Sequence, residues 1–234
     1  ELERLMIIDC IADTHGHFPK LEGGDLLIVA GDLTSNDRID QNELFRQWIK
    51  KQSYKKKIVI AGNHDNLAQK GFYNNPESNN LYKLDYLCDS GTEFEGLKIW
   101  GSPWTKTFEG MNPACKAFTV DTEEDLAEKW ALIPKDTDIL ITHSPPKYGL
   151  DRTIDQEFVG SESLKDWIFI QQPKLHAFGH VHESYGIITH QTIQDINFKI
   201  TGKINDKLCR TTIVNASHVN ELFMPVNKPL RIIL

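Results

Sequence analysis

The segment Lys57-Ile58-Val59-Ile60-Ala61-Gly62-Asn63-His64-Asp65 joins a short apolar run to a turn that carries an amide, an imidazole and a carboxylate. The run is rich in β-branched residues, as is typical of a strand buried on both faces. The glycine and asparagine after it are typical of a turn. We therefore predict a strand over 57–61 that ends in a cluster of polar side chains.

Four other short apolar runs end in the same way. Reacting groups of open α/β sheets lie at the carboxyl ends of the strands, so five such ends indicate one shared site. Five unrelated polar turns would be a much poorer explanation. The four runs, each with the polar residues that follow it, are 5–11 with Asp13 and His15, 26–30 with Asp32, 139–142 with His143, and 175–178 with His180 and His182.

Between these runs the sequence favours helices at 40–52, 122–130 and 161–170. In the first, apolar residues at i, i+1, i+4 and i+5 from Leu44 share one face. In the second, Thr122 and Asp125 form a capping pair. We expect the asparagine-rich segment 74–80, which also contains a proline, to be a loop.

After residue 178 the helical pattern stops, and a strand-rich segment follows. Short apolar runs alternate with amphipathic stretches before it, which is typical of an α/β domain. No linker divides the chain, so we expect a single domain over residues 1–234. The remaining strands that we expect are 97–100, 185–189, 192–200, 211–214 and 231–234.

The composition excludes several classes of protein. With 26 Lys and Arg against 33 Asp and Glu, the formal net charge is −7, which disfavours binding of long nucleic acids. We interpret the run Lys55-Lys56-Lys57 as a solvated turn rather than a nucleic-acid patch. No apolar run reaches the roughly 18 residues of a membrane span. Four dispersed cysteines indicate reduced thiols and a cytoplasmic location. Because the chain begins with Glu1, a missing upstream segment stays an open question.

The polar residues at the strand ends are suited to metal ions. Carboxylates, imidazoles and an amide, without thiolates, are ligands for Mn²⁺, Fe²⁺ or Zn²⁺. A pair of ions requires a bridging carboxylate, and Asp32, central in the set, is the natural bridge. Asp13 and His15 lie on one tight turn and can chelate one ion. Two carboxylates against two divalent ions leave a charge of about +2, which suits a phosphate ester.

As an ordered set, the five motifs resemble those of the calcineurin-like metallophosphoesterases. The similarity is closer still to the MPPED-like (metallophosphoesterase domain-containing) phosphodiesterases, and it extends to Gly101-Ser102-Pro103-Trp104-Thr105 and Asn215-Ala216-Ser217. The resemblance implies a four-layer α/β/β/α sandwich. The motifs are Asp13-Thr14-His15, Gly31-Asp32, Gly62-Asn63-His64-Asp65, Thr142-His143 and Gly179-His180-Val181-His182.

The resemblance also implies roles for these residues. A hydroxide that bridges two divalent ions would attack phosphorus in line, and His64, which is not a ligand, would protonate the leaving oxygen. Mn²⁺ is the ion that we expect first, with Fe²⁺, Zn²⁺ and Mg²⁺ as alternatives. The implied ligands are Asp13, His15 and His182 for one ion, Asn63, His143 and His180 for the other, and Asp32 as the bridge.

The chain departs from related sequences at three places. Protein Ser/Thr phosphatases continue Gly-Asp with x-x-Asp-Arg, whereas Gly31-Asp32 is followed by Leu-Thr-Ser-Asn, so the acidic partner of His64 is missing. This argues against a protein phosphatase, and whether Asp65 replaces that partner is left open. Some MPPED-like members lack the first histidine of the last motif; His180 is present here, so we expect full two-metal activity. The long segment 189–211 suggests an extended hairpin, more readily a surface insertion than a dimer contact or pocket rim.

Several other residues are secondary candidates. We expect His17 to lie in a surface turn, although it could reach a phosphate. We expect Trp100 to lie in the core. For Trp104, core packing and stacking on a nucleobase are equally good interpretations, and Phe108 could also stack on a nucleobase. Among the histidines without a motif, we interpret His176 as structural. The others are His190 and His218, the latter of which follows Asn215-Ala216-Ser217 and could approach the site.

Together these features predict a binuclear metal-dependent phosphodiesterase that acts on small phosphodiesters. Cyclic 3′,5′-nucleotides are the substrate class that the resemblance implies. The alternatives are a broad-specificity phosphomonoesterase, a nuclease, which the net charge disfavours, and a non-catalytic metal-binding scaffold. The expected ligand is a small phosphodiester or nucleotide. The natural substrate, the metal pair and the oligomeric state stay open.

Overall fold

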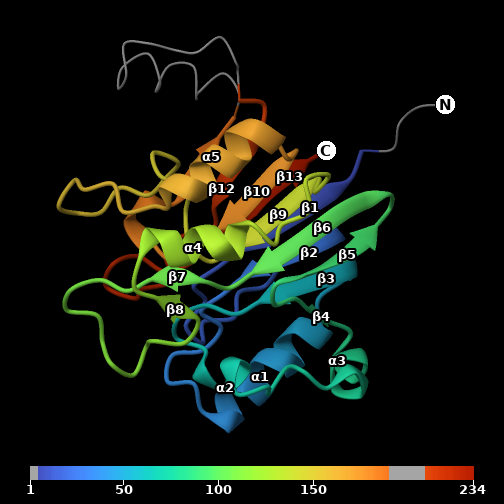
Figure 1. Ribbon diagram of the computed structural model, residues 1–234. Coiled ribbons are helices and arrows are strands. Elements are labelled where there is room, and N and C mark those ends of the chain that lie inside the picture. Colours follow the sequence, from blue (N-terminus) through green and yellow to red (C-terminus); the bar gives the residue numbers. More distant parts are fainter. Residues whose placement is uncertain (1–4, 190–208) are drawn as a thin grey trace.

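A computed structural model describes residues 5–189 and 209–234 of the chain, in which two mixed β-sheets pack face to face (Figure 1). The first sheet has the order β13-β1-β2-β3-β4, and the second has the order β11-β12-β10-β9-β6-β5. The strands of the first sheet are β1 (Ile7–Ile11), β2 (Gly24–Ala30), β3 (Tyr54–Ile60), β4 (Asp85–Tyr86) and β13 (Leu230–Ile233). Those of the second are β5 (Ser90–Phe94), β6 (Leu97–Ser102), β9 (Ile139–Thr142), β10 (Leu175–Phe178), β11 (Gly186–Ile188) and β12 (Thr212–Asn215).

Parallel strands form the centre of each sheet. In the first sheet β1 to β4 run parallel and β13 pairs antiparallel with β1. In the second sheet β6, β9, β10 and β12 run parallel, while β5 and β11 are antiparallel edge strands. The carboxyl ends of parallel neighbours meet at one edge of a sheet, which is where the polar motifs follow.

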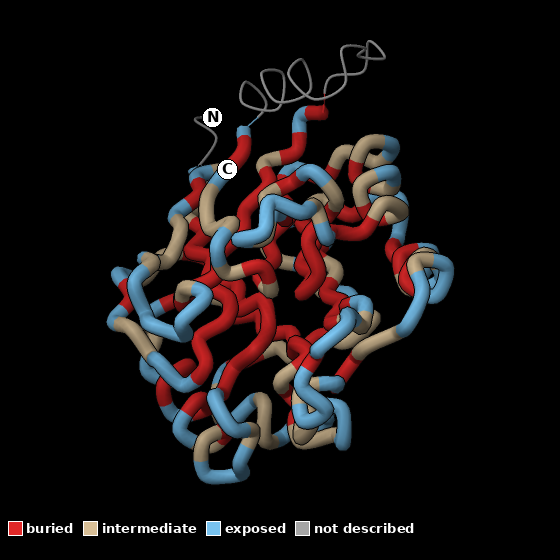
Figure 2. The backbone as a smooth tube through the Cα atoms, turned by 90° about the vertical axis from the view of Figure 1, so that its left-hand side faces the viewer, coloured by how far each residue is buried: buried red, intermediate tan, exposed pale blue. Residues whose placement is uncertain are grey.

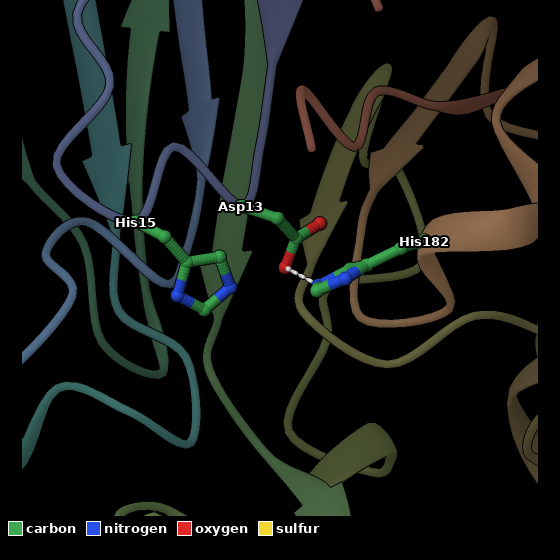
Figure 3. A group of neighbouring side chains, drawn as sticks. All are labelled: Asp13, His15 and His182. Carbon is green, nitrogen blue, oxygen red and sulfur yellow. Dashed lines mark ion pairs between the residues drawn. The ribbon is translucent and has the colours of Figure 1, made fainter. Parts of the chain in front are cut away.

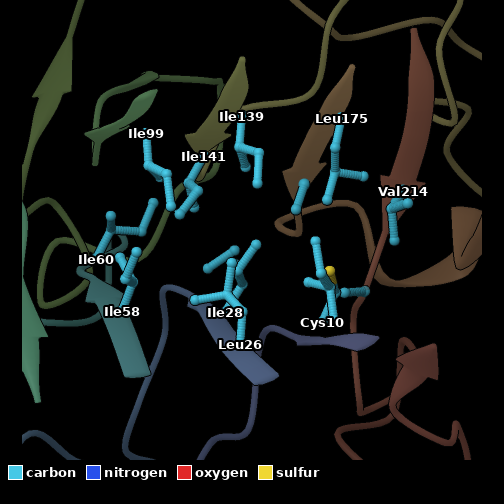
Figure 4. Packing of buried hydrophobic residues seen from close by; sticks show 14 of the residues in the cluster. Cys10, Leu26, Ile28, Ile58, Ile60, Ile99, Ile139, Ile141, Leu175 and Val214 are labelled. Carbon is cyan, nitrogen blue, oxygen red and sulfur yellow. The ribbon is translucent and has the colours of Figure 1, made fainter. Parts of the chain in front are cut away.

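The residues between the two sheets explain why the runs are continuously apolar. Alternate residues of a strand point to opposite faces. In β2, Leu26 and Ile28 therefore face the second sheet, where they join Ile141 and Leu175, as Figure 4 shows. Leu27 points the other way, into the cluster beneath the first helix. Both faces of the strand are buried, so both must be apolar.

Helices cover the outer face of each sheet, which confirms the predicted four-layer sandwich. Phe45 and Ile49 of α1 pack on the first sheet, and Leu126 of α4 and Leu164 of α5 pack on the second. Buried residues accordingly concentrate in the interior and exposed ones in the peripheral loops (Figure 2). The helices are α1 (Ile39–Lys50), α2 (Asn66–Gln69), α3 (Pro76–Tyr82), α4 (Glu123–Trp130), α5 (Glu162–Gln171) and the 3₁₀ helix η1 (His182–Ser184). A small additional sheet pairs β7 (Thr105–Lys106) with β8 (Thr119–Val120).

Most of the predicted elements are confirmed, including the capping box of α4. The Asp125 backbone nitrogen donates to Thr122 Oγ1 over 3.1 Å, and the Thr122 backbone nitrogen donates to Asp125 Oδ2 over 3.2 Å. Leu44, which we expected on the buried face of α1, is 54% exposed. Residues 190–208 lie outside the described part, so the strand expected at 192–200 and most of the hairpin expected at 189–211 are not tested.

The prediction of a loop over 74–80 was wrong, because this segment contains α3. The Asn75 side chain accepts hydrogen bonds from the backbone nitrogens of Glu77 and Ser78 at 3.0 and 3.2 Å. Pro76 occupies the first helical position, where a missing N–H costs nothing. Asparagine and proline thus start a helix here rather than break one.

The solvated turn predicted for Lys55-Lys56-Lys57 was also wrong, because β3 begins at Tyr54. The Lys57 side chain is buried, and its Nζ donates to the carbonyl oxygens of Ile49 and Gln52 at 2.8 and 3.2 Å. A lysine stabilises the carboxyl end of a helix in this way, because the last carbonyls lack partners within the helix. Across the described residues, no helix has the length and apolar character needed to cross a bilayer.

Candidate metal centre

The turns after β1, β2, β3, β9 and β10 bring the predicted site residues together at one edge of the sandwich. Potential ligand atoms lie within 4.8 Å of one another in three overlapping groups among the described residues. Asn63 and His180 join them through contacts given below. The groups are Asp13, His15 and His182; His15, Asp32 and His64; and Asp13, Asp32 and His143.

The first set of predicted ligands surrounds the Asp13 carboxylate. Figure 3 shows this carboxylate between the rings of His15 and His182. Asp13 Oδ1 lies 3.6 Å from His182 Nε2. The aspartate is fully buried and His15 is nearly so, whereas the side chain of His182 is partly exposed, so the set lies just beneath the surface.

The second set of predicted ligands surrounds the amide of Asn63. Its Oδ1 lies 3.2 Å from His143 Nε2 and 3.0 Å from His180 Nδ1. An amide oxygen and two imidazole nitrogens therefore converge on one point, as ligands of a divalent ion do.

Asp32 lies between the two sets. Its Oδ2 is 3.7 Å from His15 Nε2 of the first set and 3.3 Å from His143 Nε2 of the second. The same oxygen is 3.8 Å from His64 Nε2, while Oδ1 accepts a hydrogen bond of 2.9 Å from the His64 backbone nitrogen. This position suits the bridging role that we predict for Asp32.

An unsatisfied nitrogen shows that this donor set fits metal ions. His15 Nε2 is buried and has no hydrogen-bond partner among the described residues. A buried polar atom without a partner costs free energy, about 1–3 kcal/mol, unless something else binds it. This nitrogen faces the Asp32 carboxylate, so an ion held between the two groups would satisfy it.

Hydrogen bonds behind the ligands orient the imidazole rings. His143 Nδ1 donates to the Ala30 carbonyl oxygen over 2.9 Å, and His182 Nδ1 donates to the Asn220 carbonyl oxygen over 3.2 Å. In each ring Nδ1 is used by this bond, so Nε2 is the nitrogen turned toward the carboxylates of the cluster and available to a metal. We did not predict Asn220 from the sequence, because no local pattern links it to His182, which lies 38 positions earlier.

Neighbours of Asp13 fix its carboxylate in the same way. Its Oδ2 accepts hydrogen bonds from Ser217 Oγ at 2.6 Å and from the His180 backbone nitrogen at 2.9 Å. Phe223, a further residue that we did not predict, places its ring 4.9 Å from that of His15 and 5.3 Å from that of His182. It thereby covers part of the first ligand set.

Two glycines of the motifs leave room for the ligands. A Cβ at Gly62 would overlap Asp32 Oδ1 and lie 2.6 Å from His143 Nε2. A Cβ at Gly179 would overlap Asp13 Oδ2. Any side chain at either position would displace a carboxylate, which explains why glycine stands there.

The backbone of the last motif is not extended. His180 has φ of 72°, in the left-handed region, and His182 begins the 3₁₀ helix η1. Asp13, His15 and Asp32 also have positive φ, between 42° and 53°. Such conformations cost energy in residues other than glycine and concentrate at functional sites. They turn the side chains of separate strands toward one point.

The carboxylates of the cluster are ionised at neutral pH. Burial opposes ionisation of Asp13, but His182 and His143 outweigh it and hold its pKa at about 2. Burial likewise opposes ionisation of Asp32, and His143 and His64 bring its pKa well below the usual range.

The histidines divide into two classes. Burial would lower the pKa of His143, but Asp32 and Asp13 raise it to about 10. Burial dominates at His15 and His180 and lowers their pKa values to about 4 and about 3. These two rings are therefore neutral at physiological pH, the form in which imidazole binds metals.

The structure also answers whether Asp65 is the acidic partner of His64. Both oxygens of Asp65 accept hydrogen bonds from backbone nitrogens, those of Asp32, Leu33 and Gly62, at 2.7–3.0 Å. The Asp65 carboxylate therefore holds the backbone of the two turns in place and does not orient the imidazole of His64. The neighbour of His64 Nδ1 is the thiol of Cys115, at 3.4 Å, a contact that we did not predict.

The secondary candidates lie mostly outside the cluster. Trp104 Nε1 donates to Asp89 Oδ2 over 2.7 Å, and Lys129 Nζ covers the ring at 4.0 Å, so the indole is used in packing. His176 is buried with Nε2 2.7 Å from Thr142 Oγ1, which agrees with a structural role. Trp100 is half-buried beside the core under α4 and α5, and His17 is exposed. Phe108 is also exposed, with its ring 6.4 Å from that of His180. His218 is buried, with Nδ1 2.7 Å from the Asn227 carbonyl oxygen, and His190 lies outside the described residues.

Comparisons with known proteins place this geometry in a family. The sequence profile of the Calcineurin-like phosphoesterase family matches residues 6–184. Human Metallophosphoesterase domain-containing protein 1 is 34% identical over 246 residues, which cover 94% of this chain and 68% of that protein.

Solved structures are similar in fold. The protein TT1561 of Thermus thermophilus aligns with a TM-score of 0.59 at 14% identity, over 91% of this chain and 89% of that chain. Purple acid phosphatase PPD1 of yellow lupin aligns with a TM-score of 0.51 at 14% identity, over 98% of this chain and 47% of that chain. At this identity they show the fold alone. Taken with the profile match and the human relative, the buried cluster of aspartates and histidines leads to one conclusion: this chain belongs to the calcineurin-like phosphoesterases and is a metallophosphoesterase.

Proposed function

We propose that the protein is a binuclear metal-dependent phosphodiesterase of small phosphodiesters, with cyclic nucleotides as candidate substrates and Mn²⁺ as the candidate ion. The position of Asp32 is the observation that carries this proposal. One of its oxygens faces nitrogens of both ligand sets and of His64, within 3.3–3.8 Å. A carboxylate between two sets of ligands is the arrangement that a pair of ions requires.

The residues would hold the two ions as the family resemblance implies. Asp13, His15 and His182 would bind one of them, and Asn63, His143 and His180 the other, with Asp32 shared. When bound, the ions supply positive charge to the phosphoryl oxygens and acidify a water molecule that serves as nucleophile. Asp13 and Asp32 offset part of that charge, so one phosphate group is matched in sign.

His64 would act as the general acid. Its side chain is 21% exposed, whereas those of His15, His143 and Asp32 are at most 3% exposed. The imidazole therefore lies where the cluster meets solvent and can reach a substrate. An alkoxide is a poor leaving group, so proton donation by His64 to the ester oxygen would lower the barrier to its departure.

A reconstitution experiment tests the proposal. The protein is stripped with a chelator and reloaded with Mn²⁺, Fe²⁺, Zn²⁺ or Mg²⁺ in parallel. Bound metal is counted, and kcat/KM is compared for bis-p-nitrophenyl phosphate, the mono-ester and a panel of cyclic nucleotides and dinucleotides. We expect two ions per chain and a preference for diesters.

Each alternative function predicts a different result. Preference for the mono-ester would identify a phosphomonoesterase, and binding of metal without hydrolysis of any ester would identify a scaffold. Asp32→Asn should remove both ions and abolish activity, because the bridge is lost. Full activity of this variant would contradict the bridging role.

A further inference from the structure

A cavity of about 480 Å³ opens beside His64. The turn 35–37 after β2, helix α2 and the segment 112–115 enclose it. We call it the leaving-group pocket. A volume of this size exceeds what a water molecule or a single ion needs and falls within the range of small-molecule sites.

The ring of His64 contacts both the cluster and the pocket. His64 Nε2 lies 3.8 Å from Asp32 Oδ2, and Nδ1 lies 3.4 Å from the sulfur of Cys115, which lines the pocket. A general acid must lie within hydrogen-bond reach of the atom that it protonates. An ester oxygen that His64 protonates would lie next to this ring, and the alcohol attached to that oxygen would then extend into the pocket.

Most residues that line the pocket carry polar side chains, although apolar atoms also contribute to its surface. Asn66 Nδ2 donates to the Ala114 carbonyl oxygen over 2.8 Å, and Asn112 Oδ1 accepts from the Ala114 backbone nitrogen over 3.0 Å. These bonds orient both amides. Asn112 and Lys70 are exposed at the pocket, and no hydrogen bond within the described part of the chain uses Asn112 Nδ2 or Lys70 Nζ, so both donors are accessible to a bound molecule.

A pocket with such donors is suited to a polar ligand rather than an apolar one. Hydroxyl groups of a bound alcohol can accept hydrogen bonds from Asn112 and Lys70 and can donate to the Asn66 amide oxygen. An alcohol without such groups displaces water from these side chains and forms no hydrogen bonds in return, so it binds less well. The shape is thus open to several alcohols, whereas the lining favours those with additional hydroxyls.

We propose that the leaving-group pocket binds the alcohol released from the phosphodiester and selects an alcohol with further hydroxyl groups, such as a sugar or a polyol. Hydrolysis breaks the bond between phosphorus and the ester oxygen, and water supplies the oxygen of the new P–O bond and releases a proton. The alcohol oxygen takes a proton from His64, which regains one from solvent. This inference rests on the proposed phosphodiesterase function and names the class of its leaving group.

Two matched substrates test the preference. Methyl phosphodiesters of glycerol and of its 2,3-dimethyl ether have the same reacting bond and differ in whether the two further hydroxyls are free or methylated. We expect the glycerol ester to have the higher kcat/KM. Asn112→Leu should lower that preference about threefold to tenfold, the value of one hydrogen bond. Asn80→Leu, an exposed asparagine of α3, is the matched control and should keep the preference. Equal kcat/KM for the two esters, or an unchanged preference in Asn112→Leu, would overturn the proposal.

A binding measurement separates the pocket from the catalytic proposal. Cys115 lines the pocket, whereas Cys88 is also half-buried but at another place, so the two thiols form an internal comparison. In metal-free protein, ribitol at high concentration should slow the reaction of N-ethylmaleimide with Cys115 but not with Cys88, as followed by peptide mass spectrometry. tert-Butanol at equal concentration should have no effect. If ribitol does not slow the labelling of Cys115, the pocket assignment is wrong, whether or not the protein hydrolyses diesters. If ribitol slows the labelling but no diester is hydrolysed, the proposed phosphodiesterase function is wrong and the pocket assignment is retained.

Discussion

At the scale of single residues, His64 differs from the buried histidines His15 and His143 in its exposure and its partner. It borders the cluster, and its second nitrogen contacts a thiol rather than a carboxylate or a carbonyl. His64→Ala should therefore retain two ions per chain. On diesters with alkyl leaving groups, we expect kcat to fall about 10²- to 10⁴-fold, the usual contribution of a general acid. With a p-nitrophenyl leaving group, which departs without a proton, the loss should be smaller.

The matched control for His64→Ala is His17→Ala, which removes an exposed histidine two residues from the predicted ligand His15. It should change neither kcat nor metal content. Loss of metal from His64→Ala would show that His64 is a ligand, and equal losses of kcat on both kinds of ester would rule out proton donation to the leaving group.

His143 should make metal binding dependent on pH. In the metal-free protein, Asp32 and Asp13 raise its pKa to about 10 against the effect of burial, so the ring holds a proton at neutral pH. A metal binds only the neutral ring and must displace that proton. Metal affinity should therefore rise with pH, about tenfold per unit for one proton, and level off above about pH 10.

Calorimetry in buffers with different ionisation enthalpies measures the protons released when Mn²⁺ binds. We expect release of a proton from His143 at neutral pH. The His143→Ala variant should bind Mn²⁺ more weakly and should not release this proton. Affinity that is constant across this pH range would contradict the assignment of His143 as a ligand.

At the scale of elements, the helices support the sheets and the turns carry the chemistry. Helix α4 lies on the outer face of the second sheet, and both hydrogen bonds of its capping box are present. Thr122→Ala removes the bond from the Asp125 backbone nitrogen to Thr122 Oγ1. We expect the free energy of unfolding in urea to fall by about 1 kcal/mol, as is typical of a lost N-cap. The activity per folded molecule should stay unchanged; a drop in kcat/KM would show that α4 influences the site.

At the scale of the whole molecule, the ligands come from both sheets. Asp13, Asp32 and Asn63 follow strands of the first sheet, and His143 and His180 follow strands of the second. Bound ions would therefore connect the two halves of the sandwich in the folded state only. A ligand of this kind stabilises a protein by about 2.7 kcal/mol at a free concentration of about one hundred times its Kd.

Removal of the ions should accordingly lower the melting temperature, and addition of Mn²⁺ should restore it in a concentration-dependent manner. Differential scanning calorimetry with and without a chelator measures the change. Asp32→Asn should show little response to either treatment, because its site is impaired. If neither the chelator nor Mn²⁺ changes the melting temperature of the wild-type protein, a metal site between the sheets is contradicted.

Local sequence patterns were sufficient for most strands and for the residues at their ends. A run such as 26–30 is buried on both faces, so its composition alone identifies it. The same approach failed at Asn75 and Pro76, since these residues start a helix or a loop with equal ease and only the hydrogen bonds to Glu77 and Ser78 distinguish the two. It also failed at Lys57, whose partners lie in the preceding helix and the turn after it.

The sequence by itself determined the α/β class, the order of the motifs and the candidate ligands, because each depends on residues adjacent in the chain. Only the tertiary structure decided which side chains contact the site residues from the surrounding protein. Cys115 reaches His64 across 51 positions, and Ser217 reaches Asp13 across 204. Such contacts arise when separate strands end at one edge, and no local pattern encodes them. The leaving-group pocket has the same origin, since helix α2, which begins at Asn66, meets the segment 112–115 only in the folded chain, where Asn66 Nδ2 donates to the Ala114 carbonyl oxygen.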